Sequence, residues 1–321
     1  MRKWVSVILI TLLLAGGAVL CAVRWQAWFG MPPEHPWTGD TISYAMPAFT
    51  HDSTPESLDL IVLGDIHNNL TREDYDTLAA RIPQADAVVQ TGDWLDRGQY
   101  YYYQLLMREW TNSGLYGLPV IACPGNHEYT KGIGKTISPI WVNTFLSRAD
   151  SCGQIQRLYG VPGASYYIDL PSVRLIAIDT NPLVRVVHLT RTLTWLRNAM
   201  YTAGDRYVIV IMHHPVLSPA KGRANTLIYT SFRHALGQAD LVLAGHDHSY
   251  MRRAPFVVLN TAGKRKTQRM RFHPEMTDTV PAYGVISLSQ PASAEQVPPM
   301  AFRVFRMKDG VLIDSLYVKH D

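Results

Sequence analysis

The segment LDLIVLGDIH, residues 58–67, joins a short apolar run to two polar side chains that follow a glycine. Its first six residues predict a buried strand, because such strands are short continuous apolar runs. Gly64 permits a turn directly after this strand, and Asp65 and His67, two residues apart, then point to the same side of an extended segment. The pattern predicts a strand that ends in a functional loop, although an isolated Asp-x-His motif has little specificity.

Four later segments repeat this arrangement. They are Gly92-Asp93, Gly125-Asn126-His127-Glu128, His213-His214-Pro215 and Gly245-His246-Asp247-His248. Apolar runs before them predict strands at 87–90, 120–123, 207–212 and 241–244. Each strand thus delivers its motif at its carboxyl end, where ligands bind in open α/β sheets.

The residue types in these motifs indicate metal chemistry. Carboxylates and neutral imidazoles bind first-row divalent metals, and a carboxylate such as Asp93 can bridge two of them. Asn126 adds a neutral amide oxygen, and His127 beside it can donate a proton. His213 and His214 are adjacent and must face differently, so we expect only one of them, His213, to be a ligand. Each motif alone could be a turn or a core histidine, but all five together favour a two-metal site for displacement at phosphorus.

The rest of the pattern predicts two mixed sheets rather than one parallel sheet, because strands outnumber helices late in the chain. A helix is expected to begin at Thr71, with Asp74 in a capping-box position. Further helices are expected at 100–110 and 192–203. Hairpins are expected to pair 165–170 with 173–178 and 302–307 with 311–318, the second through an Asp-Gly turn.

Composition and charge narrow the class of protein. The chain has 321 residues, 47% of them hydrophobic and 17% charged, which is typical of an ordered globular protein. The net charge is only +4, and the basic residues Arg2, Lys3 and Arg24 precede the globular part. Bulk charge therefore gives no reason to expect a nucleic-acid partner.

The amino terminus predicts export. Residues 4–23 carry no charge and are long enough to span a bilayer, and the preceding Arg2 and Lys3 predict that the amino terminus stays in the cytoplasm. A cleaved signal peptide, giving a secreted or periplasmic protein, is the alternative, because Ala15-Gly16-Gly17 offers small residues for cleavage. We expect a transmembrane or signal segment at 1–24, a proline-rich linker or surface strap at 25–56, and one catalytic domain at 57–321.

Two features stay open at this level. Cys123 and Cys152 could pair in an exported domain, but their spacing does not decide it. A basic cluster at 264–271 could contact an anionic substrate or lipid headgroups, or it could be a solvated loop.

The ordered motifs resemble those of the calcineurin-like metallophosphoesterase superfamily, from Asp65 to His248. The resemblance implies a four-layer αββα sandwich of two mixed β-sheets flanked by helices, with a dinuclear centre. It implies that the first metal is held by Asp65, His67, Asp93 and His248. It implies that the second is held by Asp93, Asn126, His213 and His246. His127 would protonate the leaving alkoxide, with Asp65 as a candidate orienting partner, and a bridging hydroxide would be the nucleophile.

Two local departures refine this resemblance. Residues 92–98, GDWLDRG, are similar to a Ser/Thr phosphoprotein phosphatase segment in which the arginine binds phosphate, so Arg97 could bind substrate; a structural ion pair is the alternative. Residues 245–250, GHDHSY, resemble the purple-acid-phosphatase-like branch, in which a tyrosine ligand follows the bridging aspartate by three residues. Asp96 stands there, so we expect Mn, Zn or ferrous iron rather than a coloured ferric–tyrosinate centre.

These expectations amount to an exported, membrane-anchored hydrolase of phosphoric esters with two divalent metal ions. Its substrate would be a phosphorylated small molecule, lipid or protein. The alternatives are a Ser/Thr protein phosphatase, an envelope pyrophosphatase acting on nucleotide-sugar or lipid precursors, and a non-catalytic envelope binding protein stapled by metal. His127, which binds no metal in this scheme, favours an enzyme. The oligomeric state is left open.

Overall fold

The computed structural model describes most of the chain from residue 57 onward. The described ranges are 57–129, 137–146, 155–159, 164–170, 172–183, 188–217, 226–263, 276–289 and 299–318. The expected membrane or signal segment at 1–24, the linker at 25–56, Cys152 and the basic cluster at 264–271 lie outside them. Within the described ranges, no helix has both the length and the apolar character needed to cross a membrane.

The first sheet has six strands and mixed direction. Its spatial order is β14 (Leu312–Val318), β13 (Met300–Arg306), β12 (Ala282–Leu288), β1 (Leu58–Leu63), β2 (Ala87–Gln90) and β3 (Val120–Ala122). Strands β1, β2 and β3 are parallel, whereas β12, β13 and β14 are antiparallel to their neighbours. The expected hairpin through the Asp-Gly turn is therefore confirmed as β13–β14.

The second sheet has eight strands and is also mixed. Its order is β11 (Met276–Asp278), β9 (Tyr250–Arg253), β10 (Phe256–Val258), β8 (Leu241–Ala244), β7 (Tyr207–Met212), β6 (Val173–Ile178), β5 (Tyr166–Asp169) and β4 (Ile155–Arg157). Strands β6, β7, β8 and β10 are parallel, and the others pair antiparallel. The two mixed sheets confirm the expected pair.

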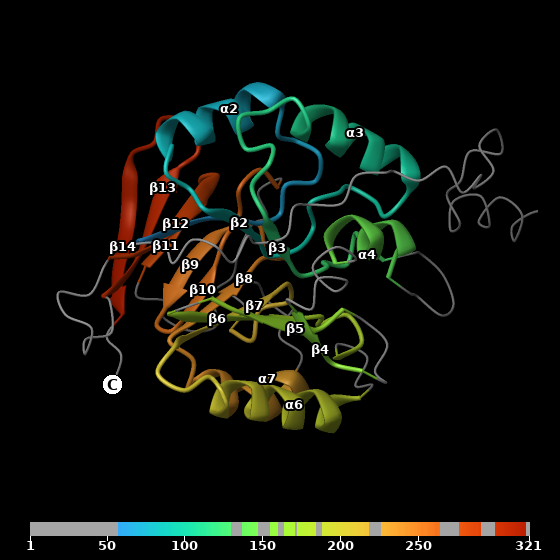
Figure 1. The fold of residues 1–321 in the computed structure, drawn as a ribbon, viewed down its shortest axis with the longest axis vertical. Coiled ribbons are helices and arrows are strands. Elements are labelled where there is room, and N and C mark those ends of the chain that lie inside the picture. The colour runs from blue at the N-terminus through green and yellow to red at the C-terminus, as the bar shows by residue number, and fades with distance from the viewer. Residues whose placement is uncertain are drawn as a thin grey trace, which may run out of the picture.

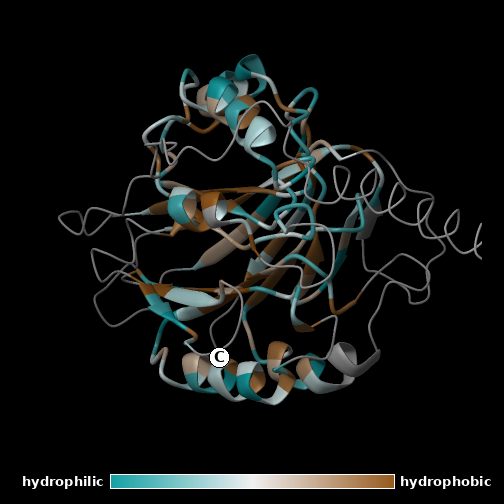
Figure 2. Cartoon of the chain, turned by 90° about the vertical axis from the view of Figure 1, so that its right-hand side faces the viewer, coloured by the Kyte–Doolittle hydropathy of each residue, from teal (hydrophilic) through white to brown (hydrophobic). Residues whose placement is uncertain are grey.

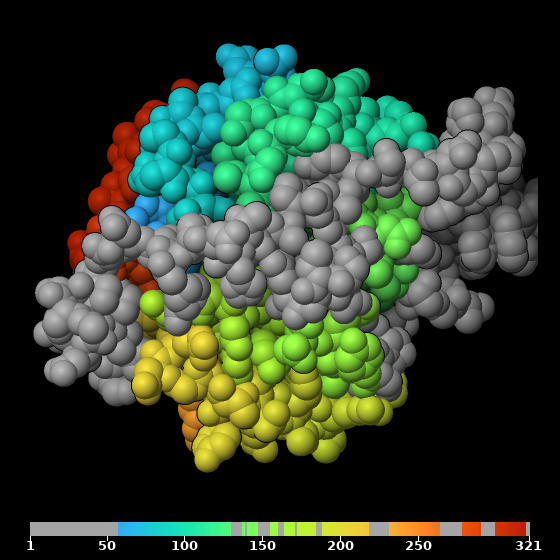
Figure 3. Space-filling model, viewed as in Figure 1, coloured from blue at the N-terminus to red at the C-terminus, as the bar shows by residue number. Residues whose placement is uncertain are grey.

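Helices lie on the outer face of each sheet (Figure 1). On these faces lie α2 (Arg72–Arg81), α3 (Tyr100–Trp110), α6 (Leu189–Tyr201) and α7 (Thr226–Leu236), whereas α4 (Pro139–Phe145) lies beside β3 at the edge of the first sheet. Helices α2 and α3 lie on the side of the first sheet, and α6 and α7 on the side of the second. In the space-filling view, the surface formed around α2 and α3 is blue to green, and the surface formed around α6 is yellow (Figure 3).

The structure has two hydrophobic cores, and successive side chains along one strand point alternately into them. Ile209 and Ile211 of β7 belong to the core that includes residues of both sheets, whereas Val208 and Val210 belong to the core against α6 and α7. Because both faces of β7 are buried, the strand reads as a continuous apolar run. Figure 2 shows these central strands as hydrophobic and the outer helices as mixed in hydropathy.

The helix after the first strand begins where its capping signal predicts. Thr71 is the residue before α2, and its side chain accepts a hydrogen bond from the Asp74 amide at 3.4 Å. The Asp74 carboxylate accepts one from the Thr71 amide at 2.9 Å. This reciprocal box satisfies two amides that a helix start leaves without partners, so the loop between β1 and α2 has a defined end.

Candidate metal centre

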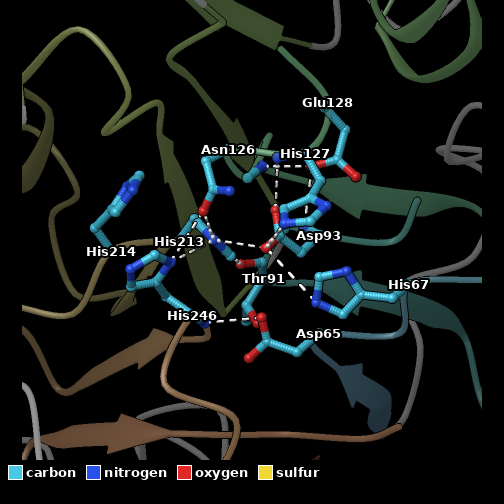
Figure 4. A network of polar contacts seen from close by, with 12 residues as sticks. Asp65, His67, Thr91, Asp93, Asn126, His127, Glu128, His213, His214 and His246 are labelled. Atoms are coloured by element: carbon cyan, nitrogen blue, oxygen red, sulfur yellow. Dashed lines mark hydrogen bonds and ion pairs between the residues drawn. The ribbon is translucent and has the colours of Figure 1, made fainter. Parts of the chain in front are cut away.

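The five motifs meet at one place, between the two sheets. Strands β1, β2 and β3 bring Asp65, Asp93 and Asn126 to the carboxyl edge of the first sheet, and β7 and β8 bring the histidine motifs to that of the second. Figure 4 shows Asp93 in the middle of this network, with His67, His127 and His213 around it. The predicted ligands therefore form one cluster in space, although they are spread over 184 residues of sequence.

One group of donors consists of Asp65, His67, Asp93 and His248, all buried. The Nε2 atom of His67 lies 3.1 Å from Nε2 of His248 and 3.7 Å from Oδ2 of Asp93. The Nε2 atom of His248 lies 3.9 Å from Oδ1 of Asp65. These are the four residues expected to hold the first metal.

A second group consists of Asp93, Asn126, His213 and His246. The Nε2 atom of His213 lies 3.2 Å from Oδ2 of Asp93 and 3.1 Å from Oδ1 of Asn126. The Nδ1 atom of His246 lies 3.0 Å from the same amide oxygen. Asp93 is thus common to both groups, which is the position expected of a bridging carboxylate.

His214 lies beside the second group but faces differently from His213. Its Nδ1 atom lies 2.8 Å from the Thr180 hydroxyl, and its ring nitrogens come close enough to those of His213 and His246 to complete a group of three potential ligands. The Thr180 contact orients the His214 ring separately from that of His213, and the expectation that only His213 of the pair is a ligand stays a prediction.

The backbone of the motifs is held in an unusual conformation. Every non-glycine residue with positive φ in the described chain except His188 belongs to these motifs or directly follows one: Asp65, His67, Asn68, Asp93, His246 and His248 have φ between 49° and 73°. This left-handed conformation costs about 1–3 kcal/mol per residue and is characteristic of functional sites. Contacts in the rest of the fold must offset this strain, so the surrounding structure imposes the backbone geometry of the motifs.

Glycines let the motif loops approach each other. At Gly125, a Cβ atom would lie only 2.1 Å from Oδ1 of Asp93, and at Gly92, where φ is +95°, it would lie 2.5 Å from Nδ1 of His213. Both contacts are shorter than van der Waals packing permits. Gly92 and Gly125, which precede Asp93 and Asn126, are therefore required for the Asp93, Asn126 and His213 loops to meet.

The donor set fits divalent cations. Burial lowers the pKa of His67 to about 3, so its imidazole is neutral at pH 7 and offers a lone pair. Burial alone would lower the pKa of His213 as well, but the nearby Asp93 carboxylate raises it to about 9, and in turn the histidines hold the pKa of Asp93 below its usual range despite burial. A cation at this place would take over the positive charge that Asp93 draws to His213.

Partner contacts fix the orientation of His213. Its Nδ1 atom lies 3.0 Å from the Thr91 carbonyl oxygen, which can only accept, so Nδ1 donates. The opposite nitrogen, Nε2, is then directed at Asp93 and Asn126. Metal-binding histidines are usually oriented in this way, by a hydrogen bond from the ring nitrogen that does not face the metal.

His127 lies at the open side of the cluster. Its side chain is 34% exposed, its Nε2 atom lies 3.9 Å from Oδ2 of Asp93, and its amide donates to Oδ1 of Asp93 at 2.9 Å. Its Nδ1 atom donates to the carbonyl oxygen of Asp96. The partner that orients His127 is therefore the backbone at Asp96, where we expected Asp65; Asp65 instead accepts the His246 amide at 2.9 Å.

Arg97 is placed beside the site but paired weakly. Its Nε atom lies 3.9 Å from the Asp96 carboxylate, and both side chains are 47% exposed. The turn that carries Arg97 packs against the His127 loop, since a Cβ at Gly98 would lie 2.8 Å from the Glu128 carbonyl oxygen. The long contact with Asp96 leaves the guanidinium at the surface, one residue after the carbonyl that accepts from His127.

Sequence reasoning gave no role to Glu128, which the structure places beneath the centre. Its buried carboxylate accepts from the amides of Asp93 at 2.9 Å, Leu95 at 3.0 Å and Gly125 at 2.6 Å. Burial and the charge of Asp93 raise its pKa. Glu128 thus ties the Asp93 loop to the Asn126 loop. Its place directly after Asn126-His127 was the only signal in the sequence.

The loop after β10 supports Asp65 from the second sheet. Thr261 is buried; its amide donates to the Gly64 carbonyl at 2.7 Å and its hydroxyl accepts from the Gly64 amide at 3.0 Å. This exchange of hydrogen bonds holds the end of β1 against the second sheet. No pattern in the sequence linked residues 64 and 261.

Comparison with known proteins places the fold. No curated protein matches the chain significantly in sequence. The fold is similar to that of GAP50, the anchor in the inner membrane complex of Plasmodium, with a TM-score of 0.56 and 13% identity over 83% of this chain and 89% of that one. It is also similar to that of purple acid phosphatase PPD1 from yellow lupin (Lupinus luteus) seeds, with a TM-score of 0.57 and 13% identity over 83% of this chain and 54% of that one.

A match to a protein-family model shows the family of this chain. The model of the calcineurin-like phosphoesterase family matches residues 58–250, which is more than half of the chain and includes all five motifs. This is the superfamily that the motifs resemble, and its members are metal-dependent hydrolases of phosphoesters. The chain therefore belongs to the calcineurin-like phosphoesterase family and is a metallophosphoesterase.

Proposed function

We propose that this protein hydrolyses phosphoric esters at a dinuclear centre formed by the two donor groups that share Asp93. The observation that carries the proposal is the position of Asp93 Oδ2, which lies 3.2 Å, 3.7 Å and 3.9 Å from ring nitrogens of His213, His67 and His127. One carboxylate oxygen thus faces a histidine of each proposed metal group and the proposed acid.

The residues would divide the work as follows. Asp65, His67 and His248 would hold one ion, Asn126, His213 and His246 would hold the other, and Asp93 would contact both. Two divalent ions held there would supply a hydroxide nucleophile, by lowering the pKa of bound water, and would neutralise charge on the phosphoryl oxygens. Most of these ligands are buried, whereas Asn126 is exposed and His246 half-buried, so the substrate would enter on the side of Asn126 and His246.

His127 would protonate the leaving alkoxide. Because its Nδ1 donates to the Asp96 carbonyl, the proton to be transferred would lie on Nε2, which is directed toward Asp93 and the open side. A positioned acid contributes about 10²–10⁴-fold to such reactions. The non-catalytic alternative gives no reason for a histidine at this place.

A protein phosphatase is the second candidate, and Arg97 is the observation that favours it. The Arg97 side chain is 47% exposed, and the carbonyl of the preceding Asp96 accepts from the proposed acid, so its guanidinium could bind a phosphate through two parallel hydrogen bonds. On this proposal, Arg97→Ala raises KM for phosphopeptides while kcat changes little. An unchanged KM would leave Arg97 as a structural partner of Asp96.

Export is proposed from the amino-terminal segment alone. The uncharged residues 4–23 after Arg2 and Lys3 support an anchored protein with its catalytic domain outside the cytoplasm. Protease added to intact cells that express the full chain should remove the catalytic domain. Protection of the domain until the cells are lysed would contradict export.

The experiment that tests the proposed function uses the full chain, purified with Mn²⁺ and assayed with an aryl phosphate, the matching diester and pyrophosphate. We expect turnover with at least one of them, and a large loss in Asp93→Asn. Asp169→Asn, far from the site, is the matched control. Turnover by Asp93→Asn within about tenfold of wild type would overturn the assignment, because removal of a key charge from a preorganised site costs about 10²–10³-fold.

A further inference from the structure

A buried polar pair at the end of β6 contacts the loop of the candidate site, although neither residue is a metal ligand in the proposed scheme. Asp179 and Asn181 directly follow Ile178, the last residue of this second-sheet strand, and are 2% and 5% exposed. More than fifty residues separate them from the Asn126 motif. Buried polar groups are retained only when they are hydrogen-bonded, so their partners indicate what they do.

Asn181 holds the segment before Asn126. Its Nδ2 atom lies 3.2 Å from the carbonyl oxygen of Pro124 and 3.2 Å from that of Gly125. The same atom lies 3.0 Å from Oδ1 of Asp179. The amide group of Asn181 therefore fixes the two carbonyl groups that immediately precede Asn126 in the chain.

Asp179 holds the segment after His127. Its carboxylate accepts from the hydroxyl of Tyr129, from the Ala164 amide at 3.0 Å and from the Asn181 amide at 3.1 Å. Burial raises its pKa, while the hydrogen bonds from Tyr129 and Asn181 act in the opposite direction. A buried network of this kind specifies one geometry, because every group left without its partner is costly.

The loop 124–129 is thus held from two sides. Glu128 ties it to the first sheet through the amides of Asp93 and Leu95, and Asp179 and Asn181 tie it to the second. Between these anchors lie Asn126, whose Oδ1 is 3.1 Å from His213 Nε2, and His127. A displacement of about 1 Å in such a site can cost 10²-fold in rate.

We propose that Asp179 and Asn181 are positioning residues that set the Asn126 amide oxygen and the His127 ring against the second sheet. The proposal rests on the proposed function, since it assigns the pair to the metal group of Asn126, His213 and His246. It predicts that the pair governs affinity for one ion of the two. The group of Asp65, His67 and His248 takes no residue from loop 124–129, so it should keep its ion.

The test is a Mn²⁺ titration of the full chain by calorimetry, with parallel measurements of kcat, KM and Tm. Asn181→Ala should weaken binding at one of two sites by about 10–100-fold, the usual effect of losing a residue that orients a metal ligand. Its kcat should fall while KM stays near that of wild type. Tyr129→Phe removes one hydrogen bond and should show a smaller change of the same kind.

The matched control, Asp169, lies on the neighbouring strand β5, where it pairs with Arg174 at the opposite end of β6 from Asp179. Asp169 accepts two hydrogen bonds of 2.6 Å from Arg174 of β6, so Asp169→Asn disturbs a comparable polar contact without touching loop 124–129. It should lower Tm and leave both Mn²⁺ affinities unchanged.

Three outcomes are decisive. Loss of one Mn²⁺ site in Asn181→Ala, with both sites kept in Asp169→Asn, supports the proposal even if no tested substrate is turned over. Two wild-type affinities and a wild-type kcat in both Asn181→Ala and Tyr129→Phe would overturn it and leave the proposed function standing. A wild-type chain that binds no Mn²⁺ would overturn both.

Discussion

Polar side chains join the two sheets at several places, and two of these places differ in how their charges are balanced. At the candidate metal centre, Asp93 of the first sheet meets His213 of the second. In what we call the arginine brace, Asp314 of β14 accepts from Arg252 Nε and from the Tyr250 hydroxyl of β9, each at 2.6 Å. The brace pairs each acceptor with a donor, whereas the metal centre gathers carboxylates and imidazoles on strained backbone.

The two junctions contribute differently to the protein. The brace is complete by itself and stabilises the contact between the sheets. The metal centre brings two histidine Nε2 atoms within 3.1 Å of each other and holds Asp65, His67 and Asp93 at positive φ. Such an arrangement lowers stability unless a cation binds, and functional sites commonly have this character. Substitutions at the two junctions should therefore have opposite signatures.

The largest effect is expected from Asp93→Asn. The change removes the charge shared by both donor groups, so activity with an aryl phosphate should fall by about 10³-fold, at the upper end of losses for a key group in a preorganised site. Its Tm in EDTA should stay within a few degrees of wild type. A steep fall in Tm with modest loss of activity would make Asp93 structural and erase the contrast with the brace.

His127→Ala should separate proton transfer from metal binding. We expect loss of about 10²-fold or more with alkyl phosphates, whose leaving groups need a proton, and a much smaller loss with p-nitrophenyl phosphate, whose leaving group is weakly basic. Mn²⁺ affinity measured by calorimetry should be unchanged. Equal losses with both esters would contradict the role of a general acid.

Metal removal should affect the two junctions differently. Each ion bound only by the folded protein contributes about 2.7 kcal/mol when its concentration is 100 times Kd, so Mn²⁺ should raise Tm above the value in EDTA. The rise should persist in Asp314→Asn and shrink in His213→Ala. Scanning calorimetry of the three proteins checks this, and an equal rise in all three would place the stabilising ions elsewhere.

The smallest effect is expected from Asp314→Asn, and it depends on pH. Burial alone would raise the pKa of Asp314, but the hydrogen bonds from Arg252 and Tyr250 hold it below the usual value. The carboxylate therefore stabilises the fold at pH values above its unfolded pKa, near 3.9, and this contribution is lost as the pH falls through the lower folded value. We expect a loss of about 2 kcal/mol at pH 7.

Urea unfolding at several pH values checks this prediction. The difference between wild type and Asp314→Asn should disappear in acid, and activity at pH 7 should change little. A difference that grows as the pH falls would mean that the brace does not hold Asp314 in its charged form.

Strands buried on both faces could be predicted from the sequence. The strands expected at 58–63, 87–90, 173–178, 207–212 and 241–244 agree with the structure, because each is a short apolar run bounded by turn residues. Strand β12 was missed. Its Gly284 interrupts the pattern, and the structure explains it: a Cβ there would lie 2.6 Å from the Phe302 ring.

The starts of the predicted helices were predicted unevenly: α3 begins at Tyr100 as expected without a side-chain cap. Helix α2 begins after the Thr71 capping box as expected, whereas α6 begins at Leu189, three residues before the predicted start. His188 precedes α6 in a left-handed conformation and makes no side-chain capping bond. The sequence around it offered no cue for the boundary.

Site residues that directly follow a predicted strand could be placed from the sequence. The positions of the ligand motifs follow from strand ends, so their meeting was predictable. The supports that come from elsewhere were not: the Asp96 carbonyl that orients His127, and Asn181, which reaches loop 124–129 from another sheet. Backbone partners and contacts across sheets leave no periodic pattern, so only the folded structure reveals them.

Anomalous X-ray diffraction from crystals of the full chain grown with Mn²⁺ tests the central claim most directly. The account predicts two peaks about 3.5–4 Å apart, on either side of the Asp93 carboxylate, one next to His67 and His248 and the other next to Asn126 and His213. A single peak, or peaks away from Asp93, would contradict it.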